Sequence, residues 1–241
     1  QVRGFVRYNS RNDLGMLKWL APEILSQIEI MQGDLRDNEA VRNAVRGVDT
    51  VFHLGALIAI PYSYVNPREV IDVNIMGTLN VLMAARDFGT RRVVHTSTSE
   101  VYGTAQYVPI DEKHPLQGQS PYSASKIGAD RIAESFYRSF ETPVVTLRPF
   151  NTFGPGQSMR AVIPTIIVQA LTRDEVKLGS LEPSRDFTFA KDTANGFVKV
   201  AEAEGVLGEE INLGNDNTIR IGSLAEKIFK IIGKTPKIVA D

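Results

Sequence analysis

The stretch RVVHTSTSE at residues 92–100 passes from an apolar run into hydroxyls and one acid, and YSASK follows at residues 122–126. An apolar run of this length is typical of a buried strand. Tyr122 and Lys126 are four residues apart, so a helix places them on the same face. An ammonium there favours the ionised form of a nearby phenol, whose ordinary pKa is about 10. With the Thr98 hydroxyl to share the proton, the pattern indicates a phenol that deprotonates an alcohol.

Outward from this stretch, short apolar runs alternate with helical patterns at least four times. We expect strands at 2–8, 28–31, 49–54, 92–97 and 144–147, and helices at 38–45, 67–88 and 122–140. Apolar strands of this kind are typical of a parallel sheet that helices cover on both faces. The sequence therefore predicts an α/β fold with a doubly wound parallel sheet.

Ligands of such sheets bind beyond the carboxyl ends of the strands. Four clusters of small or polar residues fall at these ends: 33–34, 54–56, 97–100 and 148–151. Asp34 is placed to accept a hydrogen bond from the exocyclic amine of a nucleotide, although Gly-Asp is also ordinary turn chemistry. Gly55 suits either the close approach of backbone to a ligand or packing of helix on strand. Glu100 is a candidate base for a second proton, or else a solvated carboxylate.

The pattern changes after residue 150. We expect residues 1–149, rejoined by about 186–214, to form a dinucleotide-binding domain, and residues 150–185 with 215–241 to form a smaller substrate-binding lobe. Helices are expected at 161–171, 191–203 and 221–232, a strand at 210–213, and a polar loop at 184–187. Arg185 is of the type that pairs bidentately with a diphosphate, and Asn151 could orient a sugar phosphate. Arg185 could also be an ordinary surface charge, and Asn151 could also cap a turn.

Composition excludes several classes of function. Lys and Arg total 27 against 28 Asp and Glu, so no global field points to nucleic acid or an anionic membrane. No apolar run approaches the length of a membrane span. Zero Cys excludes disulfides and a cysteine nucleophile and fits a cytoplasmic protein, and three His without ligand-like spacing make a metal site unexpected. The chain starts at Gln1, and we expect no signal peptide in it.

Taken together, these motifs resemble the extended short-chain dehydrogenase/reductases, in their nucleotide-sugar epimerase/dehydratase branch. The resemblance rests on residues 33–35, 53–56, Asn74 with 77–78, 97–103, 122–126, 148–155 and 185–187. Within the branch, residues 56–64 and 101–115 are most similar to the N-acetylhexosamine 4,6-dehydratases of legionaminic-acid-type pathways. The resemblance implies a Rossmann-like fold, a tightly bound NAD and a nucleotide-sugar substrate.

The resemblance also implies a reaction, in which a nucleotide-linked N-acetylglucosamine is oxidised at C4 and loses water to give a 4-keto-6-deoxy sugar. Tyr122 would deprotonate the 4-hydroxyl, assisted by Thr98 and Lys126, and Glu100 would remove the C5 proton, with Ser99 beside it. The implied cofactor contacts are Arg7, Asp34, Leu35, Leu54, Gly55, Ala56, Asn74, Ser97, Tyr122, Lys126 and Pro149. The implied substrate contacts are Thr98, Asn151 and Arg185. The resemblance further implies a homodimer through helices 67–88 and 122–140.

The chain departs from the pattern of the resemblance in three places. The first strand and the Gly-rich phosphate loop are missing from the given chain, so we expect this segment to bind the cofactor poorly. Ser99 stands where the best-known hexose dehydratases carry Asp, and Thr-Ser-Glu also occurs in nucleotide-glucuronate decarboxylases. Arg7 ends a strand where an acid would bind the ribose of NAD, which leaves NADP open. The alternatives are therefore a decarboxylase, a nucleotide-sugar 4-epimerase, and a truncated non-catalytic nucleotide-binding protein.

Overall fold

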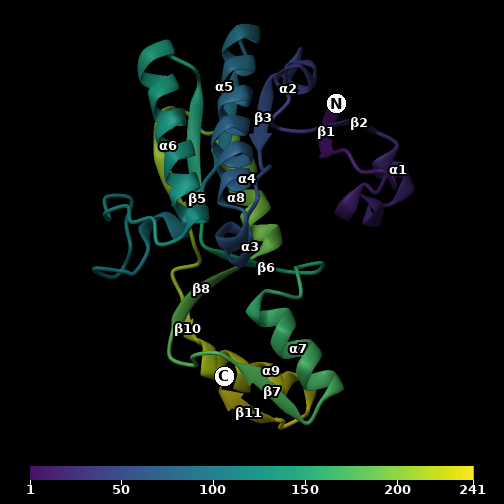
Figure 1. Ribbon diagram of the computed structural model, residues 1–241, viewed down its shortest axis with the longest axis vertical. Coiled ribbons are helices and arrows are strands. Elements are labelled where there is room, and N and C mark those ends of the chain that lie inside the picture. The colour runs from purple at the N-terminus through teal and green to yellow at the C-terminus, as the bar shows by residue number, and fades with distance from the viewer. Residues whose placement is uncertain (241) are drawn as a thin grey trace. The chain divides into compact units, whose positions relative to one another are not determined.

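A computed structural model describes residues 1–240 of the chain, which fall into two compact units (Figure 1). The first unit comprises Gln1–Pro149 with Gly196–Asn212, and the second comprises Phe150–Asn195 with the chain from Leu213 onward. The sequence placed the return to the first domain at about residue 186. In the structure the division falls inside helix α8 (Ala190–Glu202), at Gly196.

The first unit is built on a four-stranded sheet. Its strands, in spatial order, are β3 (Thr50–His53), β4 (Arg92–Thr96), β5 (Val144–Pro149) and β9 (Glu210–Leu213). Strands β3, β4 and β5 are parallel. Val93, Val94 and Val145 are fully buried, as the apolar character of these strands predicts for a sheet covered on both faces. The predicted α/β class is confirmed.

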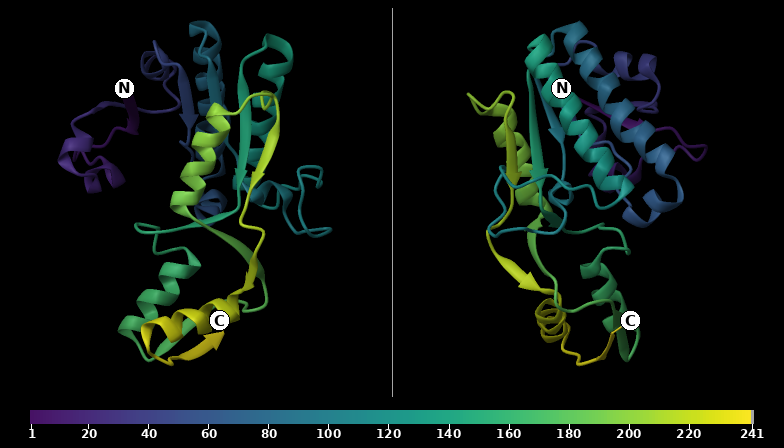
Figure 2. Two further views of the ribbon diagram at one scale, coloured as in Figure 1. Left: turned by 180° about the vertical axis from the view of Figure 1, so that it is seen from behind. Right: turned by 60° about the vertical axis from the view of Figure 1, so that its left-hand side comes forward.

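Helices cover the two faces of this sheet. On one face α5 (Gly77–Phe88) and α6 (Pro121–Phe140) lie side by side, with α2 (Asn38–Val45) against α5. Figure 2 shows α8 on the opposite face, where the Arg92 guanidinium donates to the carbonyl oxygens of Val200 and Ala203, both at 2.8 Å.

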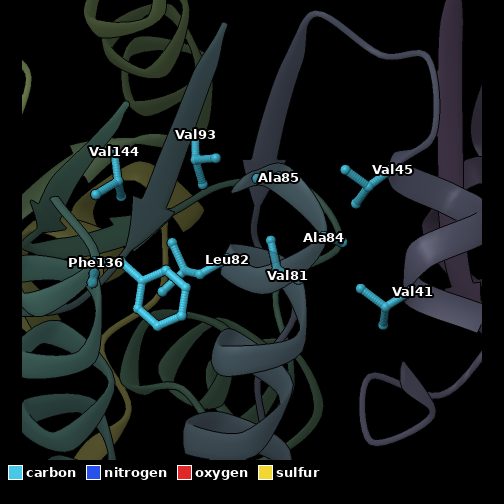
Figure 3. Packing of buried hydrophobic residues seen from close by; sticks show 10 residues of the cluster. Val41, Val45, Val81, Leu82, Ala84, Ala85, Val93, Phe136 and Val144 are labelled. Carbon is cyan, nitrogen blue, oxygen red and sulfur yellow. The ribbon is translucent and has the colours of Figure 1, made fainter. Parts of the chain in front are cut away.

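The core of the first unit fills the space between the sheet and helices α2, α5 and α6. Val93 and Val144 of the sheet point toward α5, and Phe136 of α6 closes one side (Figure 3). Val41 and Val45 of α2 close the other side against Ala84 and Val81 of α5. Burial of these side chains fixes α6 on the sheet, and α6 carries Tyr122 and Lys126.

The helix predicted over residues 67–88 is not uniform. It consists of α4 (Pro67–Ile71), a π-helical turn η2 (Asp72–Met76) and α5, and a short helix α3 (Ile60–Val65) precedes it. Turns of the π type occur mostly as single insertions in α-helices, frequently at functional sites. Here the turn contains Asn74.

Strands β1 (Val2–Arg7) and β2 (Ile28–Gly33) form a separate parallel pair, whereas the sequence analysis assigned them to the main sheet. Between them lie the short helices η1 (Gly15–Trp19) and α1 (Pro22–Leu25). The pair is attached to α2 through Arg3, whose Nη1 donates to the carbonyl oxygens of Ala44 at 2.9 Å and Arg46 at 2.8 Å. Phe5 packs against the first core.

The second unit has its own core between helices α7 (Val162–Thr172) and α9 (Ile221–Ile232). Its strands are β6 (Asn151–Phe153), β7 (Glu175–Leu178), β8 (Ser184–Phe189), β10 (Thr218–Arg220) and β11 (Lys237–Ala240). The polar loop predicted at 184–187 is wrong, because β8 pairs with β6 on one side and β10 on the other. Across residues 1–240, no helix combines the length and apolarity needed to cross a bilayer.

Candidate active site

Three of the predicted catalytic residues follow the carboxyl end of β4 in one turn. The chain is extended at Thr98 and then enters the 3-10 helix η3 (Ser99–Tyr102). The Thr98 hydroxyl accepts a hydrogen bond from the backbone N–H of Glu100 at 3.2 Å, which caps η3. Thr98, Ser99 and Glu100 are each half-buried, so the turn holds them together at the edge of the sheet.

The N-terminal part of α6 brings Tyr122 and Lys126 to this turn. Ser120 and Ser123 form a reciprocal capping box that fixes where the helix starts. Tyr122 is 7% exposed and Lys126 is 3% exposed, on the same helix face. The Thr98 side chain lies close enough to the Tyr122 phenol to lower its pKa. The structure therefore brings together the phenol, the ammonium and the strand-end hydroxyl that the sequence singled out.

The electrostatics of this pair differ from the prediction. Burial raises the pKa of Tyr122 to about 12, and the negative charges of Glu100 and Asp130 add to the effect, against a lowering by the Thr98 side chain. Burial also lowers the pKa of Lys126 to about 8, while Asp130 acts to raise it. The expectation that the ammonium favours the phenolate is wrong for this structure, because desolvation disfavours both charged forms. The Lys126 Nζ instead donates to the carbonyl oxygen of Thr96 at 2.5 Å.

A buried carboxylate lies one helical turn beyond Lys126, and the sequence analysis did not single it out. Asp130 is fully buried and accepts hydrogen bonds from the Ser97 hydroxyl at 2.7 Å and from Arg148 at 3.1 Å. The Arg148 guanidinium, also fully buried, donates to the Tyr102 hydroxyl at 3.0 Å and pairs with Glu210 at 2.7 Å. The spacing of Tyr122, Lys126 and Asp130 at i, i+4 and i+8 places them on one helix face, and this pattern could have predicted that Asp130 lies near the site.

The two strand histidines, His53 and His95, are core residues. His53 and His95 are paired across β3 and β4, with ring centroids 5.7 Å apart. Burial lowers the pKa of both imidazoles, and the Nε2 of His95 lies 3.1 Å from Asp130. Within residues 1–240, no group of three or more His, Asp or Glu is arranged to hold a metal ion.

The Leu35 side chain packs against two glycines, Gly55 in the segment after β3 and Gly77 at the start of α5. A Cβ on Gly55 would lie 2.7 Å from Leu35 Cδ1, and one on Gly77 would lie 2.9 Å from Leu35 Cβ. Both glycines therefore admit the Leu35 side chain, which is the packing role that the sequence left open. Leu54 is 62% exposed beyond the strand end, and Ala56 is half-buried. Pro149, at the carboxyl end of β5, is also half-buried.

The charged residues at the ends of β1 and β2 are already paired. Arg36 donates to Asp34 from Nε at 2.9 Å and from Nη2 at 2.7 Å, and this pairing lowers the pKa of Asp34 to about 2. The Nη2 of Arg7 lies 3.6 Å from Glu69. Asp34 is therefore ionised at neutral pH and forms an ion pair with Arg36.

The Asn74 side chain is 1% exposed, and its polar atoms bond to Leu57 and Ser125. Both amide hydrogens are used within the protein, so its predicted contact with a cofactor has no donor left to make it.

Asn151 and Arg185 lie in the second unit, where they line a pocket of about 270 Å³. Apolar side chains form much of the remaining wall: Val162, Leu178, Phe187 and Ile221. The Arg185 guanidinium is exposed and donates to the carbonyl oxygen of Ser184 at 2.9 Å. The pocket therefore has the exposed Arg185 guanidinium at one side and apolar side chains along much of its wall.

A doubly wound sheet with a Tyr-x-x-x-Lys helix facing a Thr-Ser-Glu strand end defines an extended short-chain dehydrogenase/reductase. The model of the family described as GDP-mannose 4,6 dehydratase matches residues 1–240. The chain belongs to this family, among the nucleotide-sugar dehydratases and epimerases.

Named relatives and solved structures agree with this assignment. The chain is 32% identical to the dTDP-D-glucose 4,6-dehydratase of Mus musculus, over 86% of this chain and 59% of the mouse protein. The dTDP-glucose 4,6-dehydratase DesIV of Streptomyces venezuelae, solved with NAD and TYD, has a TM-score of 0.82 at 30% identity, covering 89% of this chain and 67% of DesIV.

An epimerase is structurally as similar. The UDP-N-acetylglucosamine 4-epimerase of Methanobrevibacter ruminantium M1, in complex with UDP-N-acetylmuramic acid, has a TM-score of 0.88 at 28% identity. The match covers 98% of this chain and 77% of the epimerase. The chain spans about three-fifths of the length of the mouse relative and about a third of a trifunctional relative from Arabidopsis thaliana.

Proposed function

We propose that the protein is an NAD-dependent enzyme that catalyses the 4,6-dehydration of a nucleotide-linked hexose, with nucleotide-linked N-acetylglucosamine as the substrate. The observation that carries the proposal is the placement of the buried Tyr122 phenol beside the Thr98 side chain, on the turn that also holds Glu100. An alcohol oxidation needs only the first two residues, whereas a base for a second proton suits an elimination. The N-acetylhexosamine assignment rests on the resemblance of residues 56–64 and 101–115.

The residues around Lys126 fit a nicotinamide dinucleotide. The hydrogen bond to Thr96 uses one of the three ammonium donors of Lys126, which leaves two for ribose hydroxyls. Leu54 offers an exposed apolar surface at the carboxyl end of β3, where dinucleotides bind in such sheets. When bound, the oxidised nicotinamide supplies a hydride acceptor and a positive charge. Arg7 keeps NADP open as the alternative cofactor.

In this proposal each residue has one role. Tyr122 takes the proton of the sugar 4-hydroxyl while Thr98 hydrogen-bonds to the same oxygen. Because the pKa of Tyr122 is about 12 in the protein alone, the phenol becomes a base only when positive charge lies beside it. Glu100 removes the C5 proton, which the neighbouring C4 ketone acidifies, and passes it to the departing 6-hydroxyl, to which Ser99 donates a hydrogen bond, so that water leaves. The hydride taken from C4 would then return to C6 as C5 takes up a proton, which gives the 4-keto-6-deoxy sugar.

The proposed nucleotide contacts are in the second unit. Arg185 would pair with the diphosphate, since a planar guanidinium matches phosphate oxygens bidentately. Asn151 lines the same pocket, whose apolar wall suits a nucleobase face.

We further propose a homodimer through helices 67–88 and 122–140. Each helix carries exposed apolar side chains, with Ile71 at 44% and Met76 at 45% on the first and Phe140 at 51% on the second. A substitution Phe140→Arg is expected to shift the protein to a monomer in analytical ultracentrifugation. A dimer that persists in this variant at wild-type affinity contradicts the assigned surface.

The reaction is tested by incubating the full-length protein and NAD with UDP-N-acetylglucosamine, UDP-glucose and UDP-glucuronate, each followed by mass spectrometry. We expect the N-acetylglucosamine substrate to lose the mass of one water. Loss of carbon dioxide from the glucuronate alone would identify a decarboxylase instead. A protein that binds these compounds without converting any of them would be a non-catalytic nucleotide-binding protein.

A 4-epimerase is the second candidate, favoured by the similarity to the Methanobrevibacter ruminantium enzyme. An epimerase leaves the mass unchanged and alters the sugar, and it has no use for Glu100 as a base at C5. The same incubation therefore separates the two candidates.

A further inference from the structure

Residues 103–120 join the two elements that carry the proposed catalytic residues. The segment leaves η3 and enters α6, so the turn with Thr98 and Glu100 lies at one end of it and Tyr122 lies at the other. Figure 1 shows the segment extending outward beside the carboxyl end of β5. The way in which this segment is held therefore bears on both parts of the site.

The second half of the segment, residues 110–119, is fixed to the body of the first unit. The backbone N–H of Asn212 in β9 donates to Glu112 Oε1 at 2.8 Å. The backbone N–H of Gln117 donates to the carbonyl oxygen of Val101 in η3 at 2.8 Å. Hydrogen bonds therefore tie this half both to the main sheet and to the catalytic turn.

The first half of the segment, residues 104–109, is called the arm here, and side chains hold it against the second half. Thr104 Oγ1 accepts a hydrogen bond from Gln119 Nε2 at 2.9 Å, and the Tyr107 hydroxyl donates to Asp111 Oδ1 at 2.7 Å. Both of these contacts lie at the surface, where water competes for the same groups.

A third contact of the arm is buried and is made by His114, which is 2% exposed. Its Nε2 accepts a hydrogen bond from the backbone N–H of Gln106 at 2.9 Å, and its Nδ1 donates to the carbonyl oxygen of Pro115 at 2.9 Å. A backbone N–H only donates and a carbonyl oxygen only accepts, so these partners fix the neutral ring with its proton on Nδ1. The closed arm therefore requires an unprotonated His114.

The same imidazole supports the catalytic turn. His114 packs edge-on against Tyr102, the last residue of η3, with ring centroids 5.4 Å apart, and lies 4.7 Å from the Tyr107 ring of the arm. Gly103 alone separates η3 from the arm, and a Cβ on it would lie 2.8 Å from the carbonyl oxygen of Gln117. Because the chain is this tightly packed at Gly103, a shift of the arm is transmitted to the end of η3.

Protonation of His114 opposes the closed arm. When Nε2 takes a proton from solvent, its new N–H faces the N–H of Gln106, and neither group has an acceptor. The charged groups around the ring are two carboxylates that accept other hydrogen bonds and two cations that oppose a further positive charge: Asp111, Glu112, Lys113 and Arg148. The neighbouring titratable phenols are those of Tyr102 and Tyr107.

We propose that His114 is a positioning residue for the catalytic turn, and that its protonation releases the arm and loosens the end of η3. The consequence for catalysis rests on the proposed function, since Glu100 lies in η3. The neutral imidazole keeps the arm closed, and the arm opens as the pH falls through the range in which imidazoles gain a proton.

The first test is hydrogen–deuterium exchange of the arm in the full-length protein from pH 8 to pH 5. After correction for the intrinsic pH dependence of exchange, the protection of residues 104–109 is expected to fall about tenfold over this range, because the Gln106 N–H loses its acceptor. Protection that does not change with pH overturns the proposal, and this measurement needs no variant.

His114→Gln is the decisive variant, because its amide oxygen still accepts from the Gln106 N–H but takes no proton in this range. The protection of the arm is expected to stay constant from pH 8 to pH 5. We expect kcat near the wild-type value at pH 8, and at pH 5.5 a retained fraction of kcat several-fold larger than in the wild type. A fall in protection equal to that of the wild type overturns the role of His114, and identical pH–activity profiles overturn its effect on the turn.

Tyr107→Phe is the matched control. It removes the hydrogen bond to Asp111 in the same arm but keeps an aromatic ring against His114. The protection of the arm is expected to be lower than in the wild type by the same factor at every pH, with the pH dependence unchanged. If His114 were merely structural, His114→Gln would behave like this control. A wild-type protein that converts no nucleotide sugar refutes the proposed function instead, and the exchange series still decides whether His114 holds the arm.

Discussion

Ser97 Oγ and Asp130 Oδ2 lie 2.7 Å apart, with both residues buried, and their hydrogen bond ties the end of β4 to α6. Asp130 also pairs with Arg148 and is the negative charge that acts on Lys126 from the same helix. The proposed catalytic residues Tyr122 and Lys126 therefore lie beside a buried ionic network. Four predictions follow from this network and from the turn that holds Thr98 and Glu100.

Asp130→Asn should strongly destabilise the protein. The substitution leaves the fully buried guanidinium of Arg148 without its buried partner carboxylate. Removing one member of a buried ion pair typically costs about 3–5 kcal/mol. Urea denaturation measures the loss, and the double variant with Arg148→Met should recover part of it. A change within about 0.5 kcal/mol in the single variant would show that the network does not stabilise the fold.

Lys126→Met should raise the stability of the protein at neutral pH. Burial lowers the pKa of Lys126 from 10.5 to about 8, so the folded state binds fewer protons than the unfolded state between these values. The penalty is fully present below about pH 8 and disappears as the pH rises toward 10.5. We expect a gain of about 2 kcal/mol at pH 7, after allowance for the lost hydrogen bond to Thr96.

Thermal unfolding of the wild type and of Lys126→Met across this pH range checks the prediction. The difference in free energy of unfolding should shrink steadily above pH 8. A difference that is constant with pH, or a less stable variant at pH 7, would mean that Lys126 carries no desolvation penalty.

Tyr122→Phe should lower kcat by roughly 10²–10⁴-fold, the usual contribution of a general acid–base residue. The ring stays buried beside Thr98, so the melting temperature should stay within a few degrees of wild type. Steady-state kinetics and circular dichroism together make the measurement. Turnover at the wild-type rate in a folded variant would refute the role of Tyr122.

Glu100→Gln should separate oxidation from elimination. The variant retains Tyr122 and Thr98, so C4 is still oxidised, but the C5 proton has no base. Reduced cofactor is therefore expected to accumulate on mixing with substrate, as seen by its near-ultraviolet absorbance, while water loss slows by roughly 10²-fold or more. Water loss at an undiminished rate would remove Glu100 from the mechanism.

The sequence was sufficient for the central strands of the main sheet and for the convergence of Thr98, Tyr122 and Lys126, but not for the separate pairing of β1 with β2. Apolar strands and helical spacing predicted β3, β4, β5 and α6 closely, because both patterns report burial directly. Thr98, Tyr122 and Lys126 converge since strand ends and helix starts meet at one edge of a parallel sheet.

What the sequence did not predict depends on contacts between distant residues. The π-helical turn around Asn74 leaves the apolar spacing of 67–88 almost unchanged, so periodicity could not reveal it. The direction of the Tyr122 pKa shift depends on burial, which is set by tertiary packing. The 184–187 segment is polar at its start, yet pairing on both sides makes it a central strand.

The central claim, 4,6-dehydration, is tested most directly by running the reaction of the full-length protein with UDP-N-acetylglucosamine and NAD in D₂O. Elimination across C5 and C6 releases the C5 proton and the 6-hydroxyl as water, and C5 later takes a proton from solvent. The account predicts a product that has lost water and carries one deuterium at C5, seen by mass spectrometry and NMR. A product of unchanged mass with inverted C4 and no deuterium at C5 would contradict it.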